Sequence, residues 1–319
     1  MPITLAQAKL LTQDKLCQYV IDEFRKDPLF ELMVWDNTVN PNGMGSLTYT
    51  YNRLKTQPTA DFRAINAEYT AQEADTTQVT VNLKPFGGSF KVDRVIQQYT
   101  QGVVNHVAMQ LEQKIKATRA LFADTLINGD TASNSNAFDG IEKAVTGSST
   151  EISPSAAIDL STSANITSNA NSFMDELDRM LSLMSETPSA LLVNRQLKAI
   201  LNGIARRSGY FSTNDVDAFG APVTKYAGVP ILSVGDKPGS ANPIIPVSEG
   251  VTCLYAVVAN MDGVHGVSPN GSNVIATYLP DFKSPGAVKT GEVEMVAAIA
   301  IKATRSVAKL GNIRIATAG

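Results

Sequence analysis

Residues 78–128 read QVTVNLKPFGGSFKVDRVIQQYTQGVVNHVAMQLEQKIKATRALFADTLIN. The first part, residues 78–93, is rich in Thr, Val and Phe and alternates in part between apolar and polar side chains, which is typical of a β-strand. Asp93 can then cap a helix whose apolar residues recur at steps of three and four as far as Asn128 and Gly129. The stretch predicts a strand that leads into one helix of about 33 residues, roughly 50 Å long.

The helix does not hold a heptad repeat. His106 and Gln110 fall where the seam of a coiled coil needs apolar side chains. We therefore expect a single long helix that lies across a sheet.

Upstream of this stretch, SLTYTYNRL at residues 46–54 also has the composition of a strand, and we expect it to pair with residues 78–93 in a long hairpin. The joining residues, 55–77, are polar and far more numerous than the two to five that close an ordinary hairpin. Two isolated strands are marginal in water and present unpaired edges. The hairpin therefore needs a cover, and another subunit is one candidate.

Residues 1–43 begin with apolar side chains at helical spacing, from Leu16 to Phe24, and continue with an apolar run at residues 29–35. So few positions cannot form a core by themselves. We expect an arm that docks on the main body or on a neighbouring chain.

Downstream of the helix, residues 129–172 are rich in Ser, Thr, Asn and Ala, and we place the junction between two lobes there. Helices are expected at 173–184 and from 195 to about 209, and strands at 189–194, 229–234, 252–260 and 273–279. Val293, Met295, Ile299 and Ile301 then alternate with polar residues, which predicts a long strand with one face in a core. The sequence thus predicts an α+β protein.

The composition limits the function. Of 319 residues, 44% are hydrophobic and 18% charged, which is enough apolar surface for two packed lobes and too little charge for a disordered chain. The net charge of -3 gives no excess of basic residues that could bind nucleic acid tightly through its phosphates. Cys17 and Cys253 form no metal or disulfide motif and favour a reducing compartment. The longest apolar run, residues 295–301, is far short of the ~20 that span a membrane, so we expect a soluble protein made in the cytosol.

Catalytic residues, cofactor-binding residues and metal ligands are all predicted to be absent. His106 and His265 have no partner motif, and we interpret both as structural or solvated, with a role in pH-linked assembly as the alternative. Gly87 and Gly88 lie between two strand-like runs and are not followed by GK[ST], so they do not form a phosphate loop.

In this order of parts, several segments resemble the major capsid proteins of tailed bacteriophages, a fold that encapsulin shell proteins share. The most telling is GVPILSV after a Gly-Tyr-Phe turn. The segments that carry the resemblance are LFADTLINGD (121–130) with FDGI (138–141), FMDELDRMLSLM (173–184), PSALLVNRQLKAILNGI (188–204), GYFSTNDVDAFGAPVTKYAGVPILSVGD (209–236) and EVEMVAAIAIKATRSVA (292–308).

The resemblance implies the fold and its parts. It implies an α+β capsid fold with an N-terminal arm (1–44), an extended β-hairpin loop (45–92), a peripheral domain with a long spine helix (93–170 and 286–319) and an axial domain (171–285). Contacts between subunits are expected at Trp35, Arg53, Lys55, Asp61, Arg63, Glu68 and Glu73.

The resemblance also implies a function. The chain would be a non-enzymatic structural subunit whose copies form the hexamers and pentamers of an icosahedral virion shell around double-stranded DNA, assembled in the host cytoplasm. A portal is an expected partner, and because the arm-like part starts almost at Met1, the scaffold is expected to be a separate protein or a segment already removed. Lys55 and Lys84 are available for covalent cross-linking, but no local motif assigns that chemistry. The alternatives are an encapsulin-type nanocompartment shell and, from another class, a soluble hydrolase or binding domain.

Overall fold

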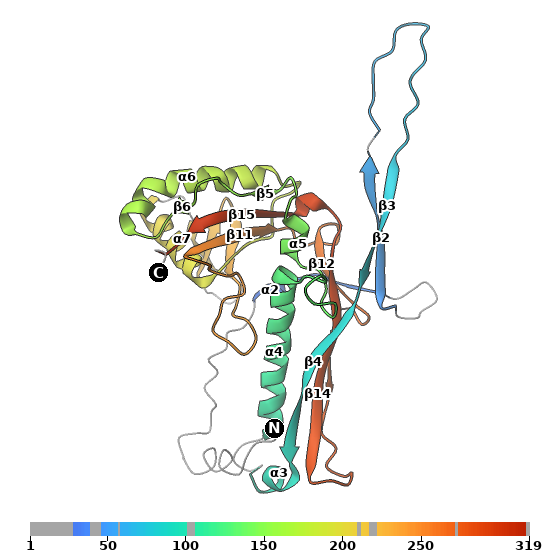
Figure 1. The fold of residues 1–319 in the computed structure, drawn as a ribbon, viewed down its shortest axis with the longest axis vertical. Coiled ribbons are helices and arrows are strands. Elements are labelled where there is room, and N and C mark those ends of the chain that lie inside the picture. Colours follow the sequence, from blue (N-terminus) through green and yellow to red (C-terminus); the bar gives the residue numbers. More distant parts are fainter. Residues whose placement is uncertain are drawn as a thin grey trace.

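The computed structural model describes residues 28–38, 46–56, 58–100, 106–208, 212–216, 222–271 and 274–316. They form an elongated body with two lobes, from which one hairpin projects (Figure 1). The elements are α2 (Pro28–Leu32), β1 (Trp35–Asn37), β2 (Thr48–Thr56), β3 (Asp75–Asn82), β4 (Lys84–Asp93), α3 (Arg94–Thr100), α4 (His106–Asn128), α5 (Ile141–Val145), β5 (Glu151–Ile152), β6 (Ile158–Asp159), α6 (Ser163–Ser182), β7 (Ala190–Val193), α7 (Arg195–Ser208), β8 (Ser212–Val216), β9 (Pro222–Tyr226), β10 (Val229–Ser233), β11 (Val251–Val257), β12 (Val264–Ser268), β13 (Ile275–Tyr278), β14 (Val288–Ile301), the 3-10 helix η1 (Thr304–Ser306) and β15 (Val307–Arg314).

The long strand β14 organises a five-stranded sheet of β1, β12, β14, β13 and β4. It alternates between exposed and buried side chains as the sequence predicts, before its last residues become buried on both faces. Its partner β4 pairs with it from Lys84 to Asp93. Helix α4 packs against β4 and β14 with Phe122 and Leu126 fully buried, which confirms a helix that lies across a sheet.

The expected single helix corresponds to two helices in the described residues. They are α3 and α4, and residues 101–105, which separate them, lie outside the described residues. Leu111 is only partly buried, whereas the apolar side chains of α4 that the core encloses lie in its C-terminal half.

The second sheet has eight strands, in the order β5, β15, β11, β7, β10, β9 and β8, with β6 also paired to β15. Both of its faces are buried. In β11, Leu254 and Ala256 belong to the core under α6 and α7, whereas Tyr255 and Val257 belong to the core shared with α4 and β14. Burial on both faces explains why β7 and β11 read as continuous apolar runs rather than as alternating strands.

Several boundaries differ from the sequence prediction. Helix α6 begins at Ser163, ten residues before the expected start at 173, because the side chain of Thr162 accepts a hydrogen bond from the backbone N–H of Asn165 and caps the helix. Within the segment 129–172, for which no helix was predicted, residues Ile141–Val145 form α5.

The expected domain boundaries do not coincide with the ends of helices or with the division of strands between the two sheets. The expected boundary at residue 170 lies within α6. Strands β12 and β13, expected in the axial domain, pair with β14, and β15, expected in the peripheral domain, pairs with β11. The domain division therefore stays a prediction.

The hairpin consists of β2 and β3, paired from Thr48↔Asn82 to Thr56↔Asp75. The expected strand 78–93 is thus split at Leu83. Residues before it pair with β2, and residues after it leave the hairpin and pair with β14. Leu83 itself is buried, which fixes the point where the chain stops pairing with β2 and begins to pair with β14.

The described part of the expected arm, residues 28–38, docks on the chain's own body. Leu29 and Met33 are buried in the core around α4, and β1 pairs in parallel with β12. The remainder, residues 1–27 and 39–45, lies outside the described residues. Within the described segments, no helix combines the length and the hydropathy needed to cross a membrane.

Candidate assembly surface

The stem of the hairpin is fixed to the end of β14. The hydroxyl of Tyr51 donates a hydrogen bond to the carbonyl oxygen of Ile301 at 2.8 Å. Arg53 donates from Nη2 to the same oxygen at 2.5 Å and from Nε to the carbonyl oxygen of Lys302 at 3.0 Å. Because a charged donor makes the stronger hydrogen bond, Arg53 is the main lock between stem and body.

A second contact holds the base of the stem. The Tyr49 hydroxyl donates to Asp36 Oδ2 at 2.9 Å, and the Lys302 ammonium lies 5.7 Å from the centre of the Tyr49 ring. Burial and the neighbouring Asp36 carboxylate raise the pKa of Tyr49 to about 12, so the phenol stays neutral and keeps donating. The hairpin therefore leaves the body in a defined direction.

The tip of the hairpin, residues 58–74, is exposed at every position. It carries three large apolar side chains with no cover: Phe62, Ile65 and Tyr69 are 109%, 90% and 65% exposed. Single exposed apolar residues are ordinary, but three of them on one projecting loop make the tip a candidate interaction site.

The tip has internal order despite its exposure. Gln72 Oε1 accepts from the backbone N–H of Thr59 at 2.8 Å and from its hydroxyl at 2.7 Å, which joins the two arms. Arg63 stacks over the Tyr69 ring at 5.3 Å and donates to the carbonyl oxygens of Ala64 and Ala67. A loop that is already ordered loses less entropy when it binds a partner.

The residues predicted to contact other subunits lie in different parts of the structure. Asp61, Arg63, Glu68 and Glu73 are exposed on the tip. Arg53 holds the stem to its own chain, and its contact with another subunit stays a prediction. Lys55 lies in β2, and its side chain is outside the described set.

Trp35 serves the chain's own core. Its ring lies 5.2 Å from the Phe122 ring and 5.4 Å from the Phe30 ring. It also covers Gly266, where a Cβ atom would come within 2.6 Å of the indole. Trp35 thus explains why β12 has glycine at this position.

The sequence-based prediction did not include Phe62, Ile65 and Tyr69 among the candidate contact residues. The available signal was the presence of large apolar side chains in a polar segment without strand or helix periodicity. Such residues have no core of their own to enter.

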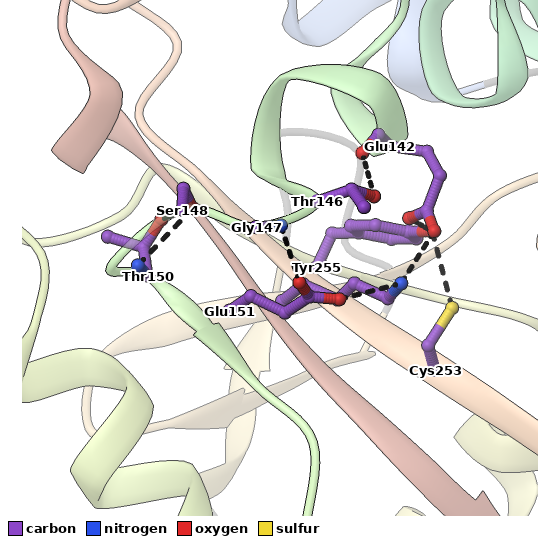
Figure 2. A network of polar contacts seen from close by, with 9 residues as sticks. Glu142, Thr146, Gly147, Ser148, Thr150, Glu151, Cys253 and Tyr255 are labelled. Carbon is purple, nitrogen blue, oxygen red and sulfur yellow. Dashed lines mark hydrogen bonds and ion pairs between the residues drawn. The ribbon is translucent and has the colours of Figure 1, made fainter.

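The strongest candidate for catalytic chemistry is a polar network between α5, β11 and β15 (Figure 2). The Tyr255 hydroxyl donates to Glu142 Oε2 at 2.6 Å and accepts from the Cys253 thiol at 3.3 Å. The Lys309 ammonium lies 2.5 Å from Glu142 Oε1 and 3.4 Å from Glu151 Oε1.

The protonation states of this network are those of a structural cluster. Burial raises the pKa of both the Cys253 thiol and the Tyr255 phenol, which keeps them neutral. Burial opposes the charge of Lys309, but the hydrogen bond to Glu142 and the nearby negative charges of Glu142 and Glu151 together outweigh it, and the pKa of the ammonium rises. A neutral thiol is a poor nucleophile, so the network is suited to holding α5 on the sheet.

The two histidines are also enclosed. Both rings are fully buried, and among the described residues neither has a hydrogen-bond partner at its ring nitrogens. Burial lowers the pKa of His106, and burial together with Lys302 lowers that of His265 to about 4. Across the described ranges, no three His, Cys, Asp or Glu side chains are grouped to hold a metal ion.

The fold is the one that phage capsid proteins and encapsulins share. The SrpI encapsulin of Synechococcus elongatus PCC 7942 is similar with a TM-score of 0.67 and 16% identity, over 98% of this chain and 97% of that chain. The capsid of an empty GTA particle is similar with a TM-score of 0.63 and 15% identity, over 94% and 100%. The capsid of Myoviridae phage XM1 is similar with a TM-score of 0.58 and 12% identity, over 98% and 99%. No protein-family model matches the chain, and no curated protein matches its sequence.

Proposed function

We propose that the chain is a major capsid protein, whose copies assemble through hexamers and pentamers into an icosahedral shell that encloses the double-stranded DNA of a tailed phage. The observation that carries this proposal is the hairpin. Its stem is locked to the body, whereas residues 58–74 are exposed throughout and carry three uncovered apolar side chains. The fold, similar over nearly the whole chain to capsids such as that of phage XM1, supports the same function.

The size of the tip fits a contact between proteins. A standard interface buries about 800 Å² on each partner, with aromatic residues at its centre and charges at its rim. Phe62 and Tyr69 would supply roughly 300 to 500 Å² of this if each is buried like an ordinary aromatic residue. Asp61, Glu68 and Glu73 would then lie around them as the rim.

The proposal includes the parts and partners of the subunit. The arm is residues 1–44, the extended loop 45–92, the peripheral domain 93–170 with 286–319, and the axial domain 171–285. A portal and a separate scaffolding protein are the proposed partners, and the virion capsid is the proposed location. With a net charge of -3, the shell would enclose DNA without gripping it through a basic surface. The role is structural rather than enzymatic.

One observation favours a second function, that of an encapsulin-type nanocompartment shell. The SrpI encapsulin complex is similar over 98% of this chain. The two functions share the shell and differ in what it holds. Particles that protect DNA from nuclease support the virus, whereas particles that contain one other protein in fixed proportion support the compartment.

The test is assembly of the purified chain. Sedimentation velocity and negative-stain microscopy, over a hundredfold range of concentration, are expected to show rings of five or six subunits or closed shells. The measurement is repeated with a co-expressed scaffolding protein if one is encoded beside the gene. A compact monomer at all concentrations, with and without scaffold, would overturn the proposal.

A further inference from the structure

The described surface offers a groove that suits the hairpin tip. We propose that the groove between α4 and residues 236–239 of one subunit receives the tip of a second copy, with Phe62 at its centre. This inference rests on the proposed function, because it requires that the chain assembles with itself.

The groove has a volume of about 220 Å³ and a floor of small residues. Ala117 and Ala120 contribute the helical side, and Pro238 and Gly239 contribute the loop side. Small side chains leave room for a ring and carry little charge, which is the surface that an exposed phenyl group needs. The lining residues are Gln110, Gln113, Lys114, Lys116, Ala117, Ala120, Asp236, Lys237, Pro238 and Gly239.

The loop wall of the groove is held in place by its own chain. Asp236 pairs with Arg195, and the backbone N–H of Lys237 donates to the carbonyl oxygen of Asn242 at 2.8 Å. Gly239 has φ of 69°, a conformation that favours glycine and closes the turn. A wall that is already formed keeps the entropic cost of binding low.

The charges of tip and groove are opposite. Residues 58–75 contain Asp61, Glu68, Glu73 and Asp75 against a single Arg63, a net charge of -3. The groove lining contains three lysines and one aspartate, a net charge of +2.

The ion pairs that these lysines make within the chain do not prevent a contact. Lys116 lies 2.9 Å from Glu112, and Lys237 lies 3.7 Å from Asp124. Exposed pairs of this kind contribute little to stability, so a partner's carboxylates can share the lysines. The groove therefore has the charge that attracts an acidic tip.

The positions of the two surfaces suit a ring. In Figure 1 the hairpin rises on the side of β4 and β14, whereas the loop that contains residues 236–239 lies beside α4 on the other side. A contact between two different surfaces of identical subunits is head-to-tail, and repeated head-to-tail contacts close rings when the rotation allows. A larger cavity of about 620 Å³ adjoins the stem residues Tyr51 and Arg53, and so lies on the hairpin's own side.

The first experiment places a cysteine on each surface. Assembled particles of the F62C/A117C double variant are oxidised and run on a non-reducing gel. We expect a ladder of covalent oligomers at least tenfold stronger than in either single variant, which control for Cys253 and Cys17. The matched control is F62C/S168C, because Ser168 is exposed on α6 and lies outside the groove. Particles whose F62C/A117C ladder is no stronger than this control overturn the groove assignment and leave the proposed function intact.

The second experiment does not depend on added cysteines. A117W fills the floor of the groove from an exposed helix position, so the monomer is expected to melt as the wild type does. The lowest concentration that yields particles is expected to rise at least tenfold. A folded A117W chain that assembles at the wild-type concentration overturns the inference. A wild-type chain that never assembles overturns the proposed function instead.

Discussion

Replacement of residues 57–74 by an Asn-Gly turn is expected to separate folding from assembly. The new turn would join Thr56 to Asp75, the last pair of the hairpin, and Asn-Gly is the preferred two-residue closure. No side chain of residues 58–74 is buried, so the core loses nothing. Shortening the loop about ninefold lowers its closure cost by about 2 kcal/mol. The thermal midpoint of the monomer is therefore expected to stay the same or to rise slightly.

Assembly is expected to respond in the opposite direction. Loss of one interface hot spot typically costs at least 2 kcal/mol, which is about a 30-fold loss of affinity for each contact. Because a shell repeats the contact at every subunit, the loss accumulates and free subunits or small oligomers should dominate. The assay compares circular dichroism melts with negative-stain images of the same preparation. Normal shells would show that the tip is not an assembly element, and insoluble protein would show that it belongs to the core.

Three further predictions concern the body and the stem of the hairpin. Leu126→Asp places a carboxylate in the fully buried face of α4 and should lower the free energy of unfolding by several kcal/mol in a denaturant titration. Leu111→Asp, at a partly buried position, should lower it clearly less, and equal losses would contradict the packing. His265 has a pKa of about 4 in the fold against 6.5 in the unfolded chain, so the free energy of unfolding should be highest above pH 6.5 and fall by up to about 3 kcal/mol as the pH drops to 4. His265→Leu should make the free energy of unfolding less dependent on pH in this range. Arg53→Ala should speed proteolysis within the stem while the core melts normally, and an unchanged cleavage rate would show that the two carbonyl contacts do not hold the hairpin.

The elements that local pattern determines were predicted well. The alternation of β14 follows from one exposed and one buried face, and the apolar spacing of α4 follows from its packing on a sheet. The hairpin and its exposed connection were also predicted, because strand composition on both sides of a long polar segment leaves few alternatives.

Which strands pair with one another was not predictable from the local sequence pattern. Residues 78–93 have the composition of one strand, but the exchange at Leu83 depends on β14, which is about two hundred positions away in the sequence. The first ten residues of α6 are mostly Ser, Asn, Thr and Ala, and they give no apolar periodicity that a reader of the sequence could follow. The apolar residues of the tip were overlooked for a related reason, since they pack against no core of their own chain.

The direct passage from β3 through Leu83 into β4 has a mechanical consequence. A pull on the hairpin along its length acts on β4 along the axis of the strand. It therefore loads all the hydrogen bonds to β14, from Ala297↔Lys84 to Val288↔Asp93, in shear. Hydrogen bonds loaded in this direction are sheared together rather than broken one after another, so the whole ladder resists at once. In the proposed shell, a force that separates the subunits would therefore be carried along the hairpin into the β4–β14 ladder of each subunit.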